Sequence, residues 1–196
     1  LVAALFALAA ATGPPVADLG VRLTATTALI MGGTLHPLLG EPEAFVDDYL
    51  ADSLDRYIAP TGASRGDSGA PDEFQPLALP TPDQLWPLFG DLSFDESVSA
   101  GAANLTAALG DAIGPTVVFG YSQSARIATV VQRTVVGGSE LSFVLVANPN
   151  RPNGGILQRF AGLVVPVLGV TFDGATPTDR FPTADISQQY DGWSDF

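Results

Sequence analysis

The chain has 196 residues, of which 46% are hydrophobic and 15% charged, so it can bury the core of one domain and is not disordered throughout. A net charge of −13 opposes contact with phosphate backbones and excludes nucleic acid as an expected partner. The sequence contains no cysteine, which excludes disulfides and cysteine-bound zinc, and no cofactor or metal is expected.

The N-terminal segment is apolar and ends at a turn. Residues 1–12 read LVAALFALAAAT, followed by Gly13-Pro14-Pro15. This run is shorter than the roughly 20 residues that span a bilayer. Residues 1–17 are therefore expected to be a signal-like or membrane-anchor segment, with a buried N-terminal helix as the alternative. The segment predicts a secreted or cell-envelope protein that associates with the membrane or envelope through its N-terminus.

Residues 18–196 are expected to form one domain in which strands and helices alternate. The apolar run at 27–31 predicts a buried strand. Apolar residues at three- and four-residue steps across 42–58 predict a helix, whose four aspartates are interpreted as a solvated face and not as a metal cluster. Residues 59–83 are rich in proline, glycine and serine and predict a surface loop.

The rest of the chain continues this alternation and predicts the fold class. The expected elements are a helix at 95–112 capped by Asp95 or Ser93, a strand at 116–119, a helix at 123–136, and strands at 141–147, 166–171 and 184–190. Near-continuous apolar strands between helices predict an α/β fold with a mostly parallel sheet and helices on both faces.

Residues 117–125 carry the most informative motif. They read VVFGYSQSA, a strand followed by Gly-x-Ser-x-Ser and the start of a helix. This is the context of a nucleophile elbow, in which a sharp turn raises the serine hydroxyl above the strand ends. The amide of Gln123 and the helix dipole would face a developing oxyanion. Gly120 and Ser124 are small, as the close approach of strand and helix requires. Ser122 is the candidate nucleophile, and a helix-capping serine is the alternative.

Two loops are expected to complete the site. Gly32-Gly33-Thr34 follows the first strand, where α/β-hydrolases place the second oxyanion amide, so Thr34 is the candidate donor and an ordinary glycine-rich turn the alternative. The loop at Leu77–Phe89, which includes Trp86, is interpreted either as a lid or acyl-binding wall or as a satellite apolar cluster.

Several segments together resemble the PE-PPE domain family. They are ALIMGGTLHP, PTPDQLWPLFG followed by LSFDESVSAG, VVFGYSQSARIA, VLVANPNRPNGGI, VLGVTFDGATPTD and QQYDGWSDF, in the family's order from about Thr27 to Phe196. The family comprises actinobacterial, mostly mycobacterial, serine α/β-hydrolases similar to cutinases and esterases. The resemblance implies an α/β-hydrolase-like fold and an acyl-ester or glycolipid substrate. It also implies an alternative, because some relatives with an N-terminal hydrophobic segment are acyltransferases in cell-envelope glycolipid assembly.

The acid partner of the serine is expected after Ser122, in the chain order of α/β-hydrolases. The candidates are Asp173, Asp179, Asp185, Asp191 and Asp195. Asp173 and Asp191 each follow a predicted strand, where the acid belongs. The resemblance matches the segment from Tyr190 onward to the family's acid-bearing segment and favours Asp191 over Asp195, with Asp173 third. A loop-capping role is the alternative for each.

No histidine follows Ser122, and the only histidine of the sequence is His36. The resemblance places the family's histidine beyond residue 196, which implies that the sequence stops short of the last strand and helix. His36 lies in the expected oxyanion loop and is interpreted as lining the pocket mouth, with a catalytic base as the lesser alternative. The chain by itself is therefore expected to be nearly inactive. A non-catalytic envelope protein that keeps the hydrolase scaffold for binding is the remaining alternative.

Overall fold

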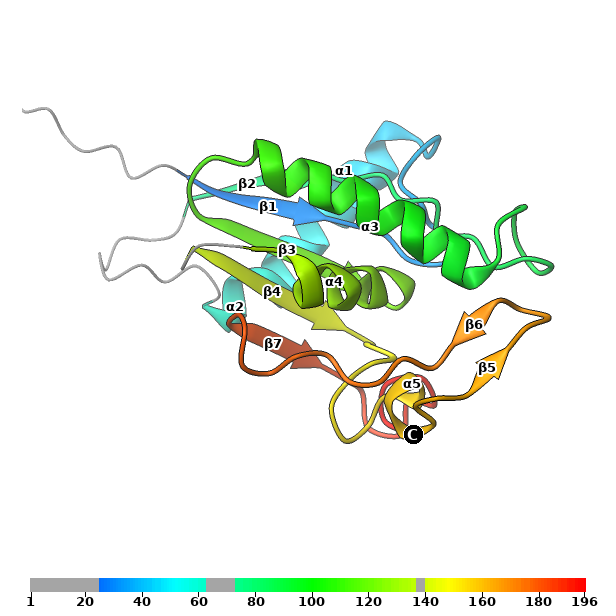
Figure 1. Cartoon of the computed structure of the whole chain (residues 1–196). Helices are drawn as coiled ribbons and strands as arrows, with labels where there is room; N and C mark the ends of the chain where they lie inside the picture. Colours follow the sequence, from blue (N-terminus) through cyan, green and yellow to red (C-terminus); the bar gives the residue numbers. More distant parts are fainter. Residues whose placement is uncertain (1–24, 63–72, 137–139) are drawn as a thin grey trace, which may run out of the picture.

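The computed structural model describes residues 25–62, 73–136 and 140–196 (Figure 1). The expected signal-like segment lies outside them. The centre of the fold is a five-stranded, wholly parallel sheet in the order β2-β1-β3-β4-β7. Its strands are β1 (Thr26–Ile30), β2 (Phe74–Ala78), β3 (Thr116–Tyr121), β4 (Leu141–Val146) and β7 (Thr183–Ile186). The predicted parallel α/β fold is confirmed.

Helices cover both faces of this sheet. They are α1 (Glu43–Ser53), the π-helical turn η1 (Leu54–Ile58), α2 (Ala59–Thr61), α3 (Phe94–Asp111), α4 (Gln123–Thr134) and α5 (Ile156–Arg159). Helices α3 and α4 lie on one face, and α1 lies on the other (Figure 1). Ser93 begins α3 through a capping box in which its side chain and that of Glu96 each accept a bond from the other's backbone amide.

The alternation of side chains along each strand builds two cores. On β3, Val118 points to the face covered by α3 and α4, whereas Val117 and Phe119 point to the face covered by α1 and η1. All three side chains are buried, so β3 is apolar on both sides. The helices pack apolar side chains on these faces and so bury both sides of the sheet.

Two sequence predictions are wrong. The loop predicted at 59–83 contains β2, an edge strand that pairs only with β1 and tolerates Pro76 because one side of it needs no partner. The strand predicted at 166–171 does not join the main sheet. Instead β5 (Val164–Val165) and β6 (Val170–Thr171) form a short antiparallel pair. The strand predicted at 184–190 is shorter, ending at Ile186.

Candidate active site

Ser122 occupies the sharp turn between β3 and α4. Its backbone has φ 57° and ψ −112°, a conformation that residues with a Cβ rarely adopt. The Ser122 amide donates to the Val146 carbonyl at 2.9 Å, which ties the turn to β4. The Ser122 side chain makes no capping bond to α4. The helix-capping alternative for this serine is therefore not what the structure contains.

Small residues on either side of Ser122 let the helix begin directly at the strand. A Cβ on Gly120 would lie 2.7 Å from the Ser124 carbonyl oxygen and 2.9 Å from the Ala125 Cα. These are backbone atoms that cannot rotate away. Ser124 itself is fully buried, so its side chain is accommodated inside the turn. The small residues that the motif places at 120 and 124 are thus required by the close packing of strand and helix.

The loop after β1 contacts the elbow. A Cβ on Gly33 would lie 2.8 Å from the Tyr121 ring and 3.0 Å from the Tyr121 carbonyl oxygen. The His36 amide donates to the Gly33 carbonyl at 2.8 Å, and Leu35 has φ 76°, so residues 33–36 form a tight turn with Thr34 inside it. The predicted oxyanion loop is therefore packed against the residue that precedes Ser122.

The side chain of Gln123 is fully buried and closes a ring of hydrogen bonds. The Gln84 amide donates to Ser97 Oγ at 2.9 Å, and Ser97 Oγ donates to Gln123 Oε1 at 2.9 Å. Gln123 Nε2 donates back to the Gln84 carbonyl at 2.8 Å. This ring fixes the start of α4, and with it the backbone amide of Gln123, against α3 and the loop after β2.

A cavity of about 590 Å³ opens at the carboxyl ends of β3, β4 and β7. Its lining comprises Tyr57, Tyr121, Ser122, Val146, Ala147, Ile186, Ser187, Gln188, Asp191 and Trp193. Parallel sheets place ligand sites at this edge, and the volume suits a small organic ligand. The structure brings Ser122 and Asp191 to one cavity although 69 positions separate them (191 minus 122).

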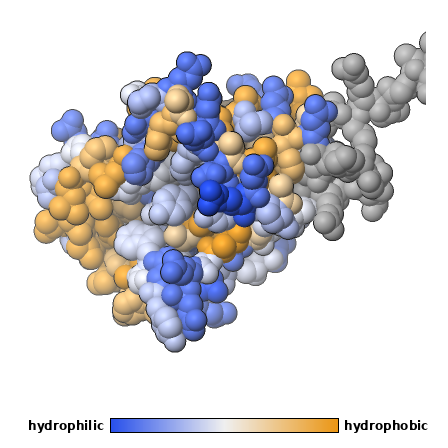
Figure 2. Space-filling view, turned by 180° about the vertical axis from the view of Figure 1, so that it is seen from behind, coloured by the Kyte–Doolittle hydropathy of each residue, from blue (hydrophilic) through white to orange (hydrophobic). Residues whose placement is uncertain are grey.

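The surface at this end of the molecule is apolar. Figure 2, the reverse view of Figure 1, shows hydrophobic residues gathered at the end toward which the strands point. Exposed apolar side chains there include Trp86 and Leu88 in the loop after β2 and Val167 in the β5–β6 connection. Leu85 packs against the core beneath. The loop after β2 thus has a core-packed side and an exposed apolar side, so both interpretations of it keep support.

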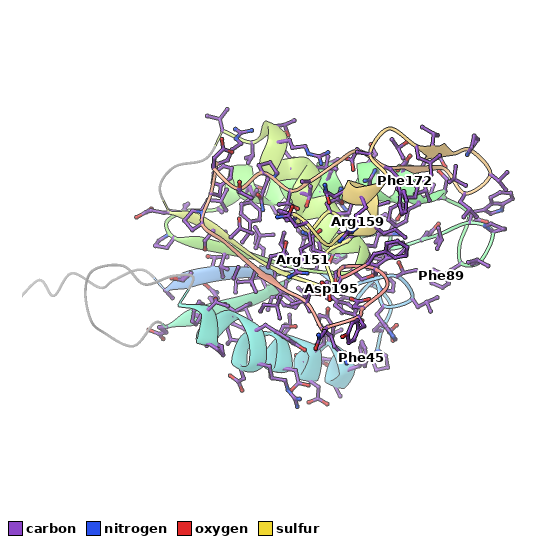
Figure 3. All side chains as sticks on the ribbon, turned by 90° about the horizontal axis from the view of Figure 1, so that it is seen from below. Phe45, Phe89, Arg151, Arg159, Phe172 and Asp195 are labelled. Carbon is purple, nitrogen blue, oxygen red and sulfur yellow. The ribbon has the colours of Figure 1, made fainter. Side chains whose placement is uncertain are left out.

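The acid candidates differ in their partners. Asp195 accepts from the Tyr190 amide at 3.0 Å and from Arg151 at 2.9 Å, and these contacts hold the pKa of its carboxyl below the usual range (Figure 3). Asp191 accepts from Ser194 Oγ at 2.6 Å and from the Trp193 amide at 3.0 Å. Of these two residues, only Asp191 lines the cavity of Ser122.

Asp173 belongs to a charged network away from this cavity. It forms ion pairs with Arg126 and Arg133 and accepts from Asn150 Nδ2 at 2.8 Å. Burial opposes ionisation of the carboxyl, but the charges of the arginines outweigh it and hold its pKa below the ordinary value. Asp95 pairs with Arg126 at 2.9 Å on the other side. The network joins α3 and α4 to the segment after β6.

Two further carboxyls are buried, Asp83, which no pattern in the sequence singled out, and Asp185, one of the acid candidates. Burial raises the pKa of Asp83 to about 6, against a bond from the Thr81 hydroxyl. Burial likewise raises the pKa of Asp185 to about 6, against a bond from Asn148. Only their positions after or within strands could have signalled burial.

Among the described residues, no group of three acidic or histidine side chains is arranged to hold a metal ion.

His36 is exposed and its ring lies 5.6 Å from that of Phe45, at the start of α1. It is not among the residues that line the cavity of Ser122. The lining of this cavity therefore gives no support to the place of His36 at its mouth, which stays a prediction. Within the described ranges, no helix has the length and hydropathy needed to cross a bilayer.

Comparison with known proteins gives the family. Residues 72–196 match the PE-PPE domain. The chain is 40% identical over 200 residues to Esterase PE16 of Mycobacterium tuberculosis (strain ATCC 25618 / H37Rv), covering 95% of this chain and 34% of that protein. It is 41% identical over 196 residues to the uncharacterized PPE family protein PPE42 of M. tuberculosis (strain CDC 1551 / Oshkosh), covering 93% and 31%. The chain thus spans about a third of the length of these relatives.

Solved structures identify the fold. A cutinase-like protein from Cryptococcus sp. superposes with a TM-score of 0.50 at 17% identity, covering 87% of this chain and 79% of that one. Lysin B from Mycobacteriophage D29 superposes with a TM-score of 0.52 at 19% identity, covering 88% and 67%. The chain therefore belongs to the PE-PPE domain family and has the α/β-hydrolase fold.

Proposed function

We propose that this chain is the hydrolase domain of a serine esterase that acts on acyl esters. The observation that carries the proposal is the strained backbone of Ser122 in the lining of a cavity that Asp191 also lines. A serine held in this way projects its hydroxyl away from the helix that follows it. The relative named as an esterase supports the same reaction class.

The proposed reaction has two steps. Ser122 Oγ attacks the acyl carbonyl carbon while its proton passes to an imidazole base, and the alcohol leaves with that proton. Water then attacks the acyl-enzyme while the same base takes its proton and gives it to Ser122 Oγ as the acyl bond breaks, which releases the acid and free Ser122. The backbone amides of Gln123 and Thr34 stabilise the oxyanion in both steps, and Asp191 orients the imidazole.

The imidazole is assigned to a histidine that follows the acid in the chain order of this fold. His36 does not suit the role, because it precedes Ser122 and its ring lies against Phe45. We therefore place the base outside the 196 residues. On this assignment the 196 residues hold the nucleophile, the oxyanion donors and the acid but not the imidazole base, which added free imidazole can replace.

Space for both halves of an ester supports the proposal. Val146, Ile186 and Trp193 give the cavity of Ser122 an apolar wall suited to an acyl chain. A second hollow of about 380 Å³, under α1, shares Tyr57 and Tyr121 with the first and offers room for the alcohol.

Chemical rescue tests this function directly. The chain is incubated with a fluorophosphonate with and without imidazole, and the modified residue is located by mass spectrometry. We expect slow modification of Ser122 that imidazole accelerates, none in Ser122→Ala, and a loss of acceleration in Asp191→Asn. Asp195→Asn is the matched control and should retain it. Modification spread over other residues, or equal rates with and without Ser122, would refute the proposal.

The acyl acceptor is tested in the same system. With imidazole and a p-nitrophenyl ester, hydrolysis releases nitrophenol and free acid. Transfer to an added sugar, the acyltransferase alternative, would instead yield a sugar ester detectable by mass spectrometry. We expect free acid as the main product, and a predominance of sugar ester would replace esterase by acyltransferase.

A further inference from the structure

The second serine of the Gly-x-Ser-x-Ser motif has contacts that its small size does not explain. Ser124 is fully buried on the first turn of α4. The Tyr121 amide donates to Ser124 Oγ at 2.8 Å. Ser124 Oγ in turn donates to the carbonyl of Gly32, 92 positions earlier in the chain. One hydroxyl therefore joins the end of β3 to the loop that follows β1.

We propose that Ser124 is a positioning residue that sets the distance between the two oxyanion donors. Its hydroxyl holds Gly32, and thereby Thr34, against the turn that carries Ser122 and Gln123. The inference rests on the proposed function, since the distance between the donors matters to catalysis only if Ser122 is the nucleophile.

The loop at residues 32–36 is closely packed on itself, so a shift of Gly32 would move the whole loop. A Cβ on Gly32 would lie 1.8 Å from the His36 carbonyl oxygen, so the chain folds directly back on itself there. The Gly33 amide donates to that carbonyl at 3.3 Å, and the His36 amide returns a bond to Gly33 at 2.8 Å. A loop closed in this way moves as a unit, and fixing Gly32 fixes the amide of Thr34 two residues later.

The elbow side of the contact is equally constrained. Gln123 lies between Ser122 and Ser124, and its buried side chain is bonded to Ser97 and to the Gln84 carbonyl. The Gln123 amide therefore cannot follow the loop if Gly32 moves. Oxyanion donors act only within about 2.7–3.1 Å of the developing charge. Loss of the Ser124 hydroxyl would leave one donor in place and release the other.

Thr129 provides a matched control on the same helix. It is also fully buried, and its Oγ1 lies 2.7 Å from Thr176 Oγ1. Thr129→Val and Ser124→Ala each remove one buried hydroxyl from α4. Only Ser124 contacts the loop after β1, so a merely structural role predicts the same behaviour for both variants.

The test measures fluorophosphonate modification of Ser122 in imidazole, together with kcat and KM for a p-nitrophenyl ester. We expect Ser124→Ala to lower the modification rate and kcat by about 10- to 100-fold, with KM nearly unchanged. Thr129→Val should lower thermal stability and leave these rates within about twofold of the starting protein. Equal rates in the two variants would overturn the inference.

Two additions keep the test decisive. If Ser124→Ala does not fold, Ser124→Cys has a similar size but only a weak donor, so its rate should also fall, and a rate no lower than that of the starting protein would contradict us. If Ser122 of the unaltered chain is not modified, the proposed function fails, and hydrogen exchange decides on the contact alone. The Tyr121 and His36 amides should then exchange faster in the Ser124 variant than in Thr129→Val, and equal exchange would refute the role of Ser124.

Discussion

Replacing Ser122 with glycine is expected to stabilise the fold while removing the nucleophile. The backbone at this residue has φ 57° and ψ −112°, which costs a residue with a Cβ about 1–3 kcal/mol. Glycine adopts the conformation freely, but ordering it costs about 0.5–1 kcal/mol more than ordering a residue with a side chain. The Ser122 side chain does not cap α4, so no such bond is lost. The expected net gain is therefore about 0.5–2 kcal/mol.

Ser122→Ala distinguishes the backbone strain at this residue from the contribution of its hydroxyl. Alanine removes the hydroxyl but keeps the Cβ, so the strain stays and the change in unfolding free energy should remain within about 0.5 kcal/mol. Urea denaturation of the three proteins measures the difference, and thermal melts should show about 2–4 °C for each kcal/mol in a domain of this size. If the glycine variant is no more stable than the alanine variant, no strain is stored at this residue. The argument that a strained backbone presents the Ser122 hydroxyl would then fail.

Three other substitutions test the surroundings of the elbow. Gly120→Ala would place a Cβ 2.7 Å from a backbone oxygen of α4, so thermal melts should show a loss of about 1–3 kcal/mol. Burial raises the pKa of Asp83 from 3.8 to about 6. Between these two pH values the Asp83 carboxyl is ionised in the unfolded chain but not in the native protein, so the native protein loses stability as the pH rises. Asp83→Asn removes this pH dependence and should be more stable by up to about 3 kcal/mol at pH 7 in urea titrations. Ser97→Ala leaves the buried amide oxygen of Gln123 without its donor and should cost about 1–3 kcal/mol, measured in the same way.

The elbow was predictable from the sequence because every contact that defines it is local. Gly120 must be small because the carbonyl of Ser124 and the Cα of Ala125 lie next to it. The strand, the turn and the helix start follow one another within a few residues, so the residue types at these positions predict the geometry of the turn. The same holds for Ser93 and Glu96, whose capping box needs only a spacing of three.

Contacts between distant segments were not predictable in the same way. β2 lacks an apolar run because it lies at the sheet edge, with Gln75 and Leu77 exposed, and its composition resembles that of a loop. The acid candidates Asp173 and Asp191 both follow predicted strands. The residues around them do not tell them apart. In the structure the arginines of α4 pair with Asp173, whereas Asp191 lines the cavity of Ser122.

The strain at Ser122 also bears on whether the scaffold serves catalysis or binding alone. A binding protein gains nothing from a residue whose backbone costs about 1–3 kcal/mol, since glycine at the same turn would relieve it. A nucleophile gains from it, because this backbone presents the hydroxyl to the cavity and the start of α4 to the oxyanion. The Ser124 hydroxyl and the Gln123 side chain hold both sides of this turn in place. Such support is needed where a strained residue must not relax, and it favours the enzyme over the binding scaffold.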